Sequence, residues 1–146
     1  MTILKIIFTS ISLTIGQTLI AQADAVVGKW ETDGGKSHIE IYKKDNEYFG
    51  KIVWLKEPRN EEGKIKRDEN NPDESKRSRP LKGLQLLKGF EYIGNKKWEE
   101  GEIYDPESGK TYSCVMTLKD NDNELHVRGY IGFSLIGRTT TWKRIE

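Results

Sequence analysis

Apolar and polar side chains alternate along most of the chain after residue 23, and this period of two is typical of β-strands with one buried face. In the segment 37–43, for example, Ile39 and Ile41 alternate with polar neighbours. Turn-forming sequences such as Asp33-Gly34-Gly35 separate the alternating segments. The eight predicted strands are Val26–Thr32, Ser37–Lys43, Tyr48–Lys56, Gly89–Ile93, Lys97–Tyr104, Lys110–Lys119, Glu124–Gly132 and Arg138–Ile145.

Consecutive antiparallel strands leave two unpaired edges unless the sheet closes on itself. We therefore expect an all-β fold, an eight-stranded antiparallel up-and-down barrel whose interior holds side chains or one small ligand. A sandwich of two sheets is the alternative, and the hairpin-like connections disfavour it. The spacing of leucines in Leu81–Lys88 predicts one short helix that caps one end of the barrel.

The first 23 residues have a different pattern. Lys5 is their only charged side chain, and the apolar run 6–20 is shorter than the roughly 20 residues that a membrane-spanning helix needs. It ends at Ala21-Gln22-Ala23, a small-x-small triplet of the kind that signal peptidase accepts. We predict a signal peptide over residues 1–23, cleaved after Ala23 or alternatively after Ala21, and a barrel domain over 24–146. The other interpretation is an uncleaved N-terminal anchor.

Export places the predicted domain in the periplasm or outside the cell, without stable membrane insertion after cleavage. The chain of 146 residues, 35% hydrophobic and 32% charged, suits one globular domain. Its 24 basic and 23 acidic side chains become 23 of each once Lys5 is removed. A neutral domain has no uniform positive field for a nucleic acid or an anionic bilayer, so we expect neither as a partner.

The longest connection, residues 56–79, has 8 basic and 7 acidic side chains among 24 residues. Loops of this length inside a domain are usually functional or disordered. The segment 68–73 alternates oxygen ligands, but Pro72 stands where a calcium-binding EF-hand loop needs a ligand. We interpret the loop as a solvated surface, and as the contact surface in the alternative function given below.

Groups suited to catalysis are few. Cys114 is the only cysteine, so it has no partner for an internal disulfide. The two histidines, His38 and His126, lie in predicted strands beside apolar residues, and the carboxylates Glu100 and Glu102 are common on an exposed strand face. The sequence also has no phosphate-binding loop, nucleophile elbow or zinc spacing. We therefore predict no catalytic residue, no metal site and no cofactor.

The first and last predicted strands suggest how the barrel closes. Gly28-Lys29-Trp30 is similar to the G-x-W motif of lipocalins. In a closed barrel these strands are neighbours, so Arg138 or Arg144 is expected to pack across Trp30, a cation–π contact worth about 0.5–2 kcal/mol. The expected structural residues are Gly28, Trp30, Arg138, Trp142 and Arg144.

Six motifs follow one another along the whole chain after residue 23. They are Gly28-Lys29-Trp30, Gly50-Lys51-Ile52-Val53-Trp54, Arg79-Pro80-Leu81-Lys82-Gly83, Gly101-Glu102-Ile103-Tyr104-Asp105-Pro106-Glu107-Ser108-Gly109-Lys110-Thr111-Tyr112, Arg128-Gly129-Tyr130-Ile131-Gly132 and Gly137-Arg138-Thr139-Thr140-Thr141-Trp142-Lys143-Arg144. Together they resemble a secreted bacterial family catalogued as a domain of unknown function, whose members have a lipocalin-like barrel. The resemblance implies this fold and export, and it supplies no catalytic residue.

Arg128-Gly129-Tyr130 is the most specific binding hypothesis, because it is similar to the R-x-Y with which intracellular fatty-acid carriers hold a carboxylate. Arg128 and Tyr130 share one face of a strand. The alternation argues against this role, since Leu125 and Val127 form the more apolar face and would turn Arg128 outward.

Large aromatic side chains either line a ligand cavity or fill the barrel. Those in question are Trp54, Trp98, Tyr104, Tyr112 and Trp142. We predict a non-catalytic protein that binds a small hydrophobic or amphipathic ligand in the barrel cavity through Trp54, Trp98, Tyr112, Arg128 and Tyr130. The alternative is a structural or protein-binding exported domain with a filled interior, which contacts partners through the loop 56–79.

Overall fold

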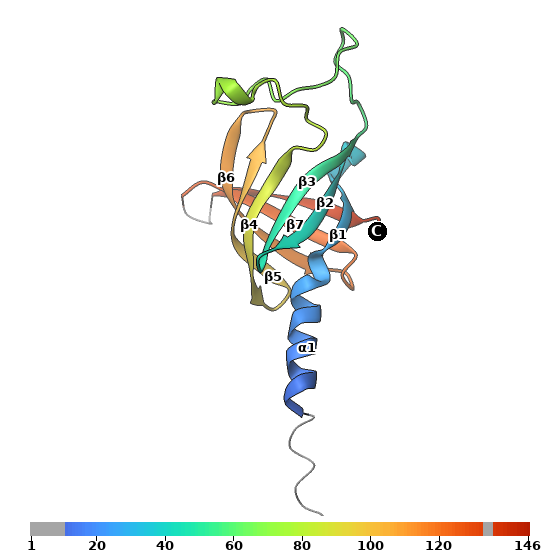
Figure 1. Cartoon of the computed structure of the whole chain (residues 1–146), viewed down its shortest axis with the longest axis vertical. Helices are drawn as coiled ribbons and strands as arrows, with labels where there is room; N and C mark the ends of the chain where they lie inside the picture. Colours follow the sequence, from blue (N-terminus) through green and yellow to red (C-terminus); the bar gives the residue numbers. More distant parts are fainter. Residues whose placement is uncertain (1–10, 133–135) are drawn as a thin grey trace, which may run out of the picture.

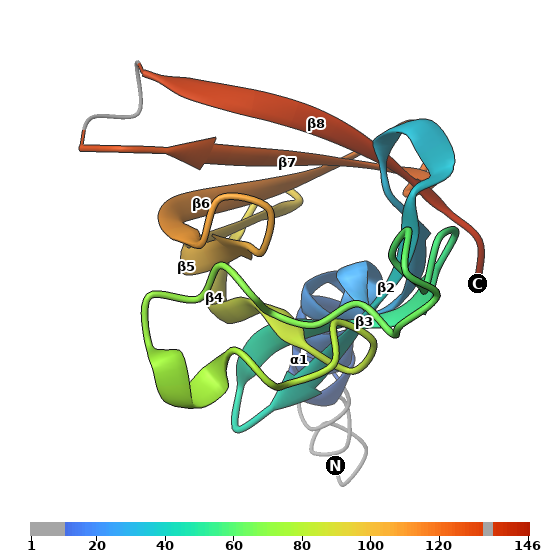
Figure 2. The same ribbon diagram turned by 90° about the horizontal axis from the view of Figure 1, so that it is seen from above.

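The structure, a computed structural model, describes residues 11–132 and 136–146. The described strands form a closed antiparallel barrel in which each strand pairs with the next and the last pairs with the first, so the predicted fold class is confirmed (Figures 1 and 2). The strands are β1 (Gly28–Glu31), β2 (Ser37–Lys44), β3 (Glu47–Leu55), β4 (Gln85–Gly94), β5 (Lys97–Asp105), β6 (Lys110–Lys119), β7 (Glu124–Tyr130) and β8 (Gly137–Arg144). The helices are α1 (Ile11–Ala23) and the 3₁₀ turns Asp24–Val26, Asp33–Gly35 and Glu74–Lys76.

Tight turns join the consecutive strands. In the β2–β3 hairpin, Asp45 and Asn46 have φ angles of 51° and 64°. Aspartate and asparagine tolerate this left-handed region, and two such residues match the twist of the flanking strands. The polar turn sequences therefore place each strand beside its predecessor.

The helix predicted over Leu81–Lys88 is wrong. Strand β4 begins at Gln85, and Leu84, Leu87 and Phe90 are all buried. Their spacing of three, typical of a helix, arises because the register between β3 and β4 shifts twice and Gly89 adopts a φ of 74°. An extra residue in a strand disrupts the period of two.

Predicted strand boundaries also change, notably in the first and fourth strands. The first strand was expected from Val26, but Asp24–Val26 is a 3₁₀ turn and β1 covers only Gly28–Glu31. The fourth was expected over Gly89–Ile93, and β4 is twice as long, at 10 residues. Both differences occur where the strand departs from regular alternation.

One continuous cluster of buried side chains fills the barrel. Its members are Val26, Trp30, Ile39, Ile41, Tyr48, Ile52, Leu84, Leu87, Phe90, Trp98, Cys114, Met116, Leu118, Leu125, Val127 and Trp142. Glycines make room for the largest of them: a Cβ on Gly101 would lie 2.4 Å from Phe90 Cγ, and one on Gly50 would lie 2.8 Å from Leu87 Cδ1. The core is therefore tightly packed around these two side chains.

The chain preceding β1 closes one end of the barrel. Trp30 Nε1 donates a hydrogen bond of 2.9 Å to the Val26 carbonyl, and Trp98 Nε1 donates one of 3.1 Å to the Ala23 carbonyl. Helix α1 extends away from this end (Figure 1). The first ten residues of the predicted signal peptide lie outside the described residues. Within the described part of the chain, no helix is long and apolar enough to cross a membrane.

The long connection between β3 and β4 lies at the opposite end from α1 (Figure 1). Its anchor is Asp68, whose side chain is completely buried. The Asp68 carboxylate accepts hydrogen bonds from Tyr104 Oη (2.6 Å), Arg79 Nη2 (2.9 Å) and Asn71 Nδ2 (2.8 Å). Burial disfavours its ionisation, but these hydrogen bonds outweigh burial and hold the pKa of Asp68 below its usual value. The predicted solvated loop is thus held to β5 through a buried carboxylate.

Candidate functional site

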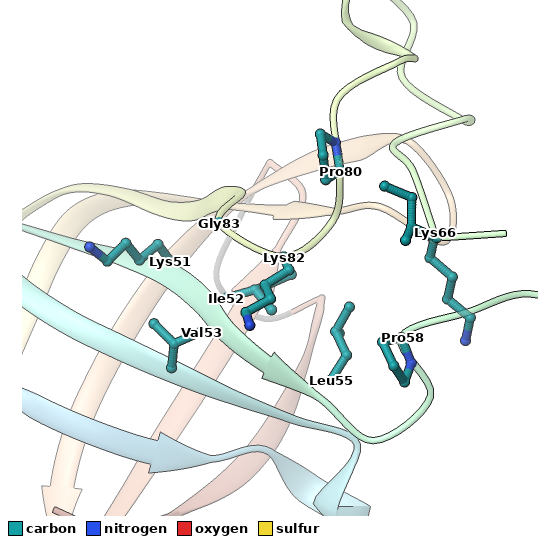
Figure 3. Close-up of a pocket in the computed structure, with 10 residues that line it drawn as sticks. Lys51, Ile52, Val53, Leu55, Pro58, Lys66, Pro80, Lys82 and Gly83 are labelled. Atoms are coloured by element: carbon teal, nitrogen blue, oxygen red, sulfur yellow. The ribbon is translucent and has the colours of Figure 1, made fainter.

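A groove of about 670 Å³ lies between β3 and the long connection. This volume is within the range of roughly 300–1,000 Å³ that is usual for small-molecule sites. Figure 3 shows the lining side chains that β3 and the long connection contribute. The lining residues are Lys51, Ile52, Val53, Leu55, Pro58, Ile65, Lys66, Pro80, Lys82 and Gly83.

Backbone hydrogen bonds frame the groove. Gly83 N–H donates to the Ile52 carbonyl at 2.7 Å, which holds the end of the long connection against β3. Leu81 N–H donates to the Lys66 carbonyl at 3.0 Å, and Lys66 N–H donates to the Pro58 carbonyl at 3.0 Å. These three bonds and the chain between them form a closed frame. A ligand would therefore enter a preformed site, which lowers the entropic cost of binding.

Apolar side chains dominate the lining. Val53 and Leu55 contribute from β3, while Pro58, Ile65 and Pro80 contribute from the long connection. Ile65 remains 39% exposed although it is a large aliphatic residue. Covering these side chains with apolar ligand surface would be worth about 25 cal/mol per Å². The lining thus favours a ligand with a hydrophobic part.

Three lysines add positive charge to this apolar lining. Lys51 Nζ lies 3.8 Å from Glu40 Oε1, and Lys66 Nζ lies 3.6 Å from Glu57 Oε2. No acidic side chain is among the described residues that line the groove. The groove therefore combines an apolar surface with a net positive rim.

A second, smaller pocket of about 300 Å³ lies between the long connection and strands β4 to β6. Its lining is mixed in charge, with Asp73 and Glu102 beside Lys76, Arg79 and Lys88. Because these charges offset one another, this pocket has less preference for any one ligand charge than the groove beside β3. Neither pocket is lined by the buried tryptophans of the core.

Two tryptophans predicted to bind ligand occupy different environments. Trp98 is fully buried, edge-on to Tyr48 and hydrogen-bonded to the Ala23 carbonyl, so it belongs to the packed core. Trp54 is 41% exposed and stacks on His38 with ring centroids 4.3 Å apart. His38 faces outward because its neighbour Ile39 is buried in the barrel, and its cross-strand partner Trp54 therefore lies outside the packed core.

The other three predicted ligand residues do not converge. Tyr112 is partly buried and lies near Gly129, because a Cβ added to Gly129 would be 3.5 Å from the Cβ of Tyr112. Arg128 alternates with the buried Leu125 and Val127, and its Nη1 donates to Thr139 Oγ1 at 3.3 Å. Arg128 and Tyr130 therefore face away from the packed core.

The predicted arginine–tryptophan contact involves Arg144. Its guanidinium carbon lies 4.2 Å from the centroid of the Trp30 ring, Nε donates to the Asp122 carbonyl at 2.7 Å, and Nη1 donates to the Val27 carbonyl at 3.1 Å. Arg138 lies exposed at the other end of β8. Trp142 is buried in the core. Gly28 lies directly against the backbone of Glu146, because a Cβ on Gly28 would lie 2.4 Å from the Glu146 carbonyl oxygen.

Sequence reasoning missed the groove itself. Its apolar lining comes from Val53 and Leu55, interpreted as ordinary strand residues, and from prolines in a segment interpreted as solvated. One signal was available, because Ile65 is the only aliphatic side chain between Lys56 and Arg79. Ile65 does line the groove, but the groove forms only when the loop folds against β3.

Few described groups are suited to catalysis. Within the residues that the structure describes, no group of three or more His, Cys, Asp or Glu side chains is arranged to hold a metal ion. Cys114 is buried, and burial raises the pKa of its thiol to about 12. A thiol that stays protonated is a poor nucleophile. The arrangement of the groove is suited to binding.

Comparisons with known proteins agree with this architecture. A solved structure from Helicobacter pylori, described as protein HP1028 and as belonging to the lipocalin family, superimposes with a TM-score of 0.71. It is 24% identical in sequence, and the match covers 83% of each chain. This similarity confirms the lipocalin-like barrel that the motifs predicted. No curated protein matches the chain.

The family comparison extends over nearly the whole barrel. Residues 28–144 match the family described as "Uncharacterized protein conserved in bacteria", DUF2147. The matched region runs from the first residue of β1 to the last residue of β8. It includes the six motifs identified in the sequence, from the G-x-W segment to the terminal arginine. The protein therefore belongs to the bacterial DUF2147 family.

Proposed function

We propose that the protein is a non-catalytic binder of a small hydrophobic or amphipathic ligand, which it holds in the groove between β3 and the long connection. The observation that carries this proposal is the groove itself, which is apolar, about 670 Å³ in volume and framed by backbone hydrogen bonds. A lipocalin-like barrel is compatible with such a role. The proposed ligand site lies where the long connection meets β3, and side chains of the protein occupy the core.

A titration with a neutral apolar fluorescent probe, N-phenyl-1-naphthylamine, tests the proposal. Ile65→Ser removes an aliphatic side chain that lines the groove, and Ile93→Ser is the matched control because Ile93 is 51% exposed on β4 and is not among the groove residues. Ile65→Ser is expected to weaken probe binding about five-fold, since one buried aliphatic side chain is worth about 1 kcal/mol at partial burial. Ile93→Ser should bind as the wild type does.

Equal weakening by both substitutions would show that the probe binds nonspecifically. Binding that neither substitution changes would exclude the groove as the site. Native mass spectrometry of protein purified from its own host provides a second measurement, because a retained small molecule would identify the ligand.

We also propose that residues 1–23 are a signal peptide and that the protein works in the periplasm or outside the cell. The direction of α1, away from the barrel, supports this proposal because all eight strands follow residue 23 (Figure 1). Cleavage after Ala23 would remove one contact with the core, the hydrogen bond from Trp98 Nε1 to the Ala23 carbonyl. Mass spectrometry of the exported protein should find Asp24 or Gln22 as the first residue. An N-terminus at Met1 would contradict cleavage.

A second candidate function is protein binding through the charged residues 56–79, and the packed core favours it. The Asp68 network gives this segment the fixed shape that a protein interface needs. The probe titration separates the two candidates, because this one predicts no specific binding of apolar molecules to the groove.

A further inference from the structure

We propose that the ligand of the groove is a single-chain anionic amphiphile, a long-chain fatty acid carboxylate, and that Lys82 binds its headgroup. This inference rests on the proposed function, because it names the class of ligand for the same groove. It goes further in assigning the charge of the ligand and the side chain that recognises it.

Lys82 differs from the other two lysines of the groove. Lys51 and Lys66 each have a carboxylate partner, at 3.8 Å in Glu40 and at 3.6 Å in Glu57. In the described part of the chain, Lys82 forms no ion pair. Its ammonium group is thus the one in the groove whose charge no neighbouring carboxylate offsets.

The position of Lys82 fits a headgroup contact. Lys82 lines the same groove as Val53 and Leu55, and Figure 3 shows its side chain directed from the connection toward β3. The nitrogens of Lys51 and Lys66 lie toward the two outer ends. An ammonium group beside apolar side chains loses hydration when a ligand covers them, and a ligand anion at that position offsets the loss. The groove therefore favours a ligand with one negative group and an apolar chain.

The backbone around the groove disfavours an extended peptide as the occupant. A peptide that adds to a sheet edge needs unpaired backbone groups. Ile52, on the β3 wall, has neither group unpaired, because its N–H donates to the Leu84 carbonyl at 3.0 Å and its carbonyl accepts from Gly83. Recognition in the groove must instead come from side chains. Val53, Leu55 and Ile65 offer an apolar surface against which an acyl chain can pack.

Isothermal titration with dodecanoate and with dodecanol tests the assignment, because the two ligands share a chain and differ in charge. The wild type should bind dodecanoate more tightly than dodecanol, by about five- to ten-fold for one partly exposed charged hydrogen bond. Lys82→Gln should remove this difference and leave dodecanol binding unchanged. Lys97→Gln is the matched control, since Lys97 is also exposed and lies outside the groove.

Other results would contradict either the assignment of Lys82 alone or the proposed function as well. If the two ligands bind the wild type equally, or if Lys82→Gln keeps the preference for dodecanoate, this inference is wrong and the proposed function stands. If neither ligand binds, both are wrong. Dodecanol binding to Lys82→Gln also reports that the variant is folded.

Discussion

Asp68 links the long connection to the barrel through a single carboxylate. Because its hydrogen bonds come from Tyr104 on β5 and from Arg79 and Asn71 within the connection, the loss of its charge affects both sides of the contact. The groove depends on this link, since Pro58, Ile65 and Pro80 belong to the same connection. A residue outside the groove lining, next to the chain segments that form it, thus determines the position of one groove wall.

We expect Asp68→Asn to lower the free energy of unfolding by about 1–3 kcal/mol at pH 7, because it weakens charged hydrogen bonds of a buried group. The folded-state pKa of Asp68 is depressed, so its contribution is fully present above the unfolded-state pKa of about 3.9 and is lost as the pH falls through the folded value. Denaturant unfolding at pH 7 and pH 3 measures both effects. The difference between wild type and variant should shrink at pH 3.

Asp33→Asn is the control, because Asp33 is exposed. It should leave the unfolding free energy nearly unchanged at both pH values. A variant Asp68→Asn that is as stable as the wild type at pH 7 would show that the carboxylate charge does not hold the connection.

Gly109 lies at another contact between the connection and the barrel, next to Asn70. A Cβ at this position would lie 2.0 Å from the Asn70 carbonyl oxygen, and the φ of Gly109 is 71°. Gly63 has a similar φ of 79°, but nothing lies within 4 Å of its added Cβ. The two positions therefore separate backbone strain from a steric clash.

Gly63→Ala should cost about 1 kcal/mol for the left-handed backbone alone. Gly109→Ala should cost at least about 1 kcal/mol more, since the connection must move away from the β5–β6 turn to make room. Thermal unfolding measures both costs, and limited proteolysis should cut the connection faster in Gly109→Ala. Equal destabilisation of the two variants would mean that the Asn70 contact contributes nothing.

At the scale of elements, the seam between β1 and β8 is the shortest strand pairing of the barrel. Its register includes only the pairs Trp30–Arg144 and Glu31–Lys143. Arg144 strengthens the seam, because its guanidinium stacks on Trp30 and donates to the carbonyls of Asp122 and Val27. A planar group with several donors suits these contacts, and lysine provides only a point charge.

Arg144→Lys is accordingly expected to destabilise the barrel by about 2 kcal/mol, the sum of a partly buried cation–π contact and lost hydrogen bonds. Arg138→Lys, on the same strand but exposed at its other end, should change stability by less than about 0.5 kcal/mol. Amide hydrogen exchange in β1 and β8 is the measurement. Unchanged protection of β1 in Arg144→Lys would contradict the role of Arg144 in the seam.

Element prediction succeeded where alternation was regular and failed where it was not. Strands β2 and β6 agree with their predicted segments within one residue, because Ile39 and Ile41, and Met116 and Leu118, alternate with outward residues. Strand β4 was shortened and partly interpreted as a helix, because Gly89 and the shifted register produce a spacing of three. A bulge is specified by pairing with a neighbouring strand, so local periodicity does not reveal it.

On the scale of the whole molecule, a packed core predicts slow access to the interior. Cys114 is 1% exposed within the closed barrel, and burial raises the pKa of its thiol to about 12. A thiol reagent such as Ellman's reagent should therefore react with Cys114 only when the barrel opens. Its rate in native buffer should fall at least about a hundred-fold below the rate in denaturant. Fast labelling of the native protein would show that the core is open to small molecules.

The sequence by itself determined the number of strands and the closed barrel, because period-two alternation and turn chemistry are local properties. It also predicted a resemblance to a bacterial family of unknown function, and a family of that description matches residues 28–144.

Only the tertiary structure decided which side chains meet. It buried Trp98, turned Trp54 and Arg128 outward, and assembled a groove from β3, Ile65 and Lys82. Strand facing depends on bulges and on pairing register, and the groove depends on contacts between residues up to 32 positions apart, from Lys51 to Gly83. Such contacts form because the Asp68 carboxylate and the backbone frame hold the long connection in place, and no local pattern of hydrophobic and polar residues encodes them.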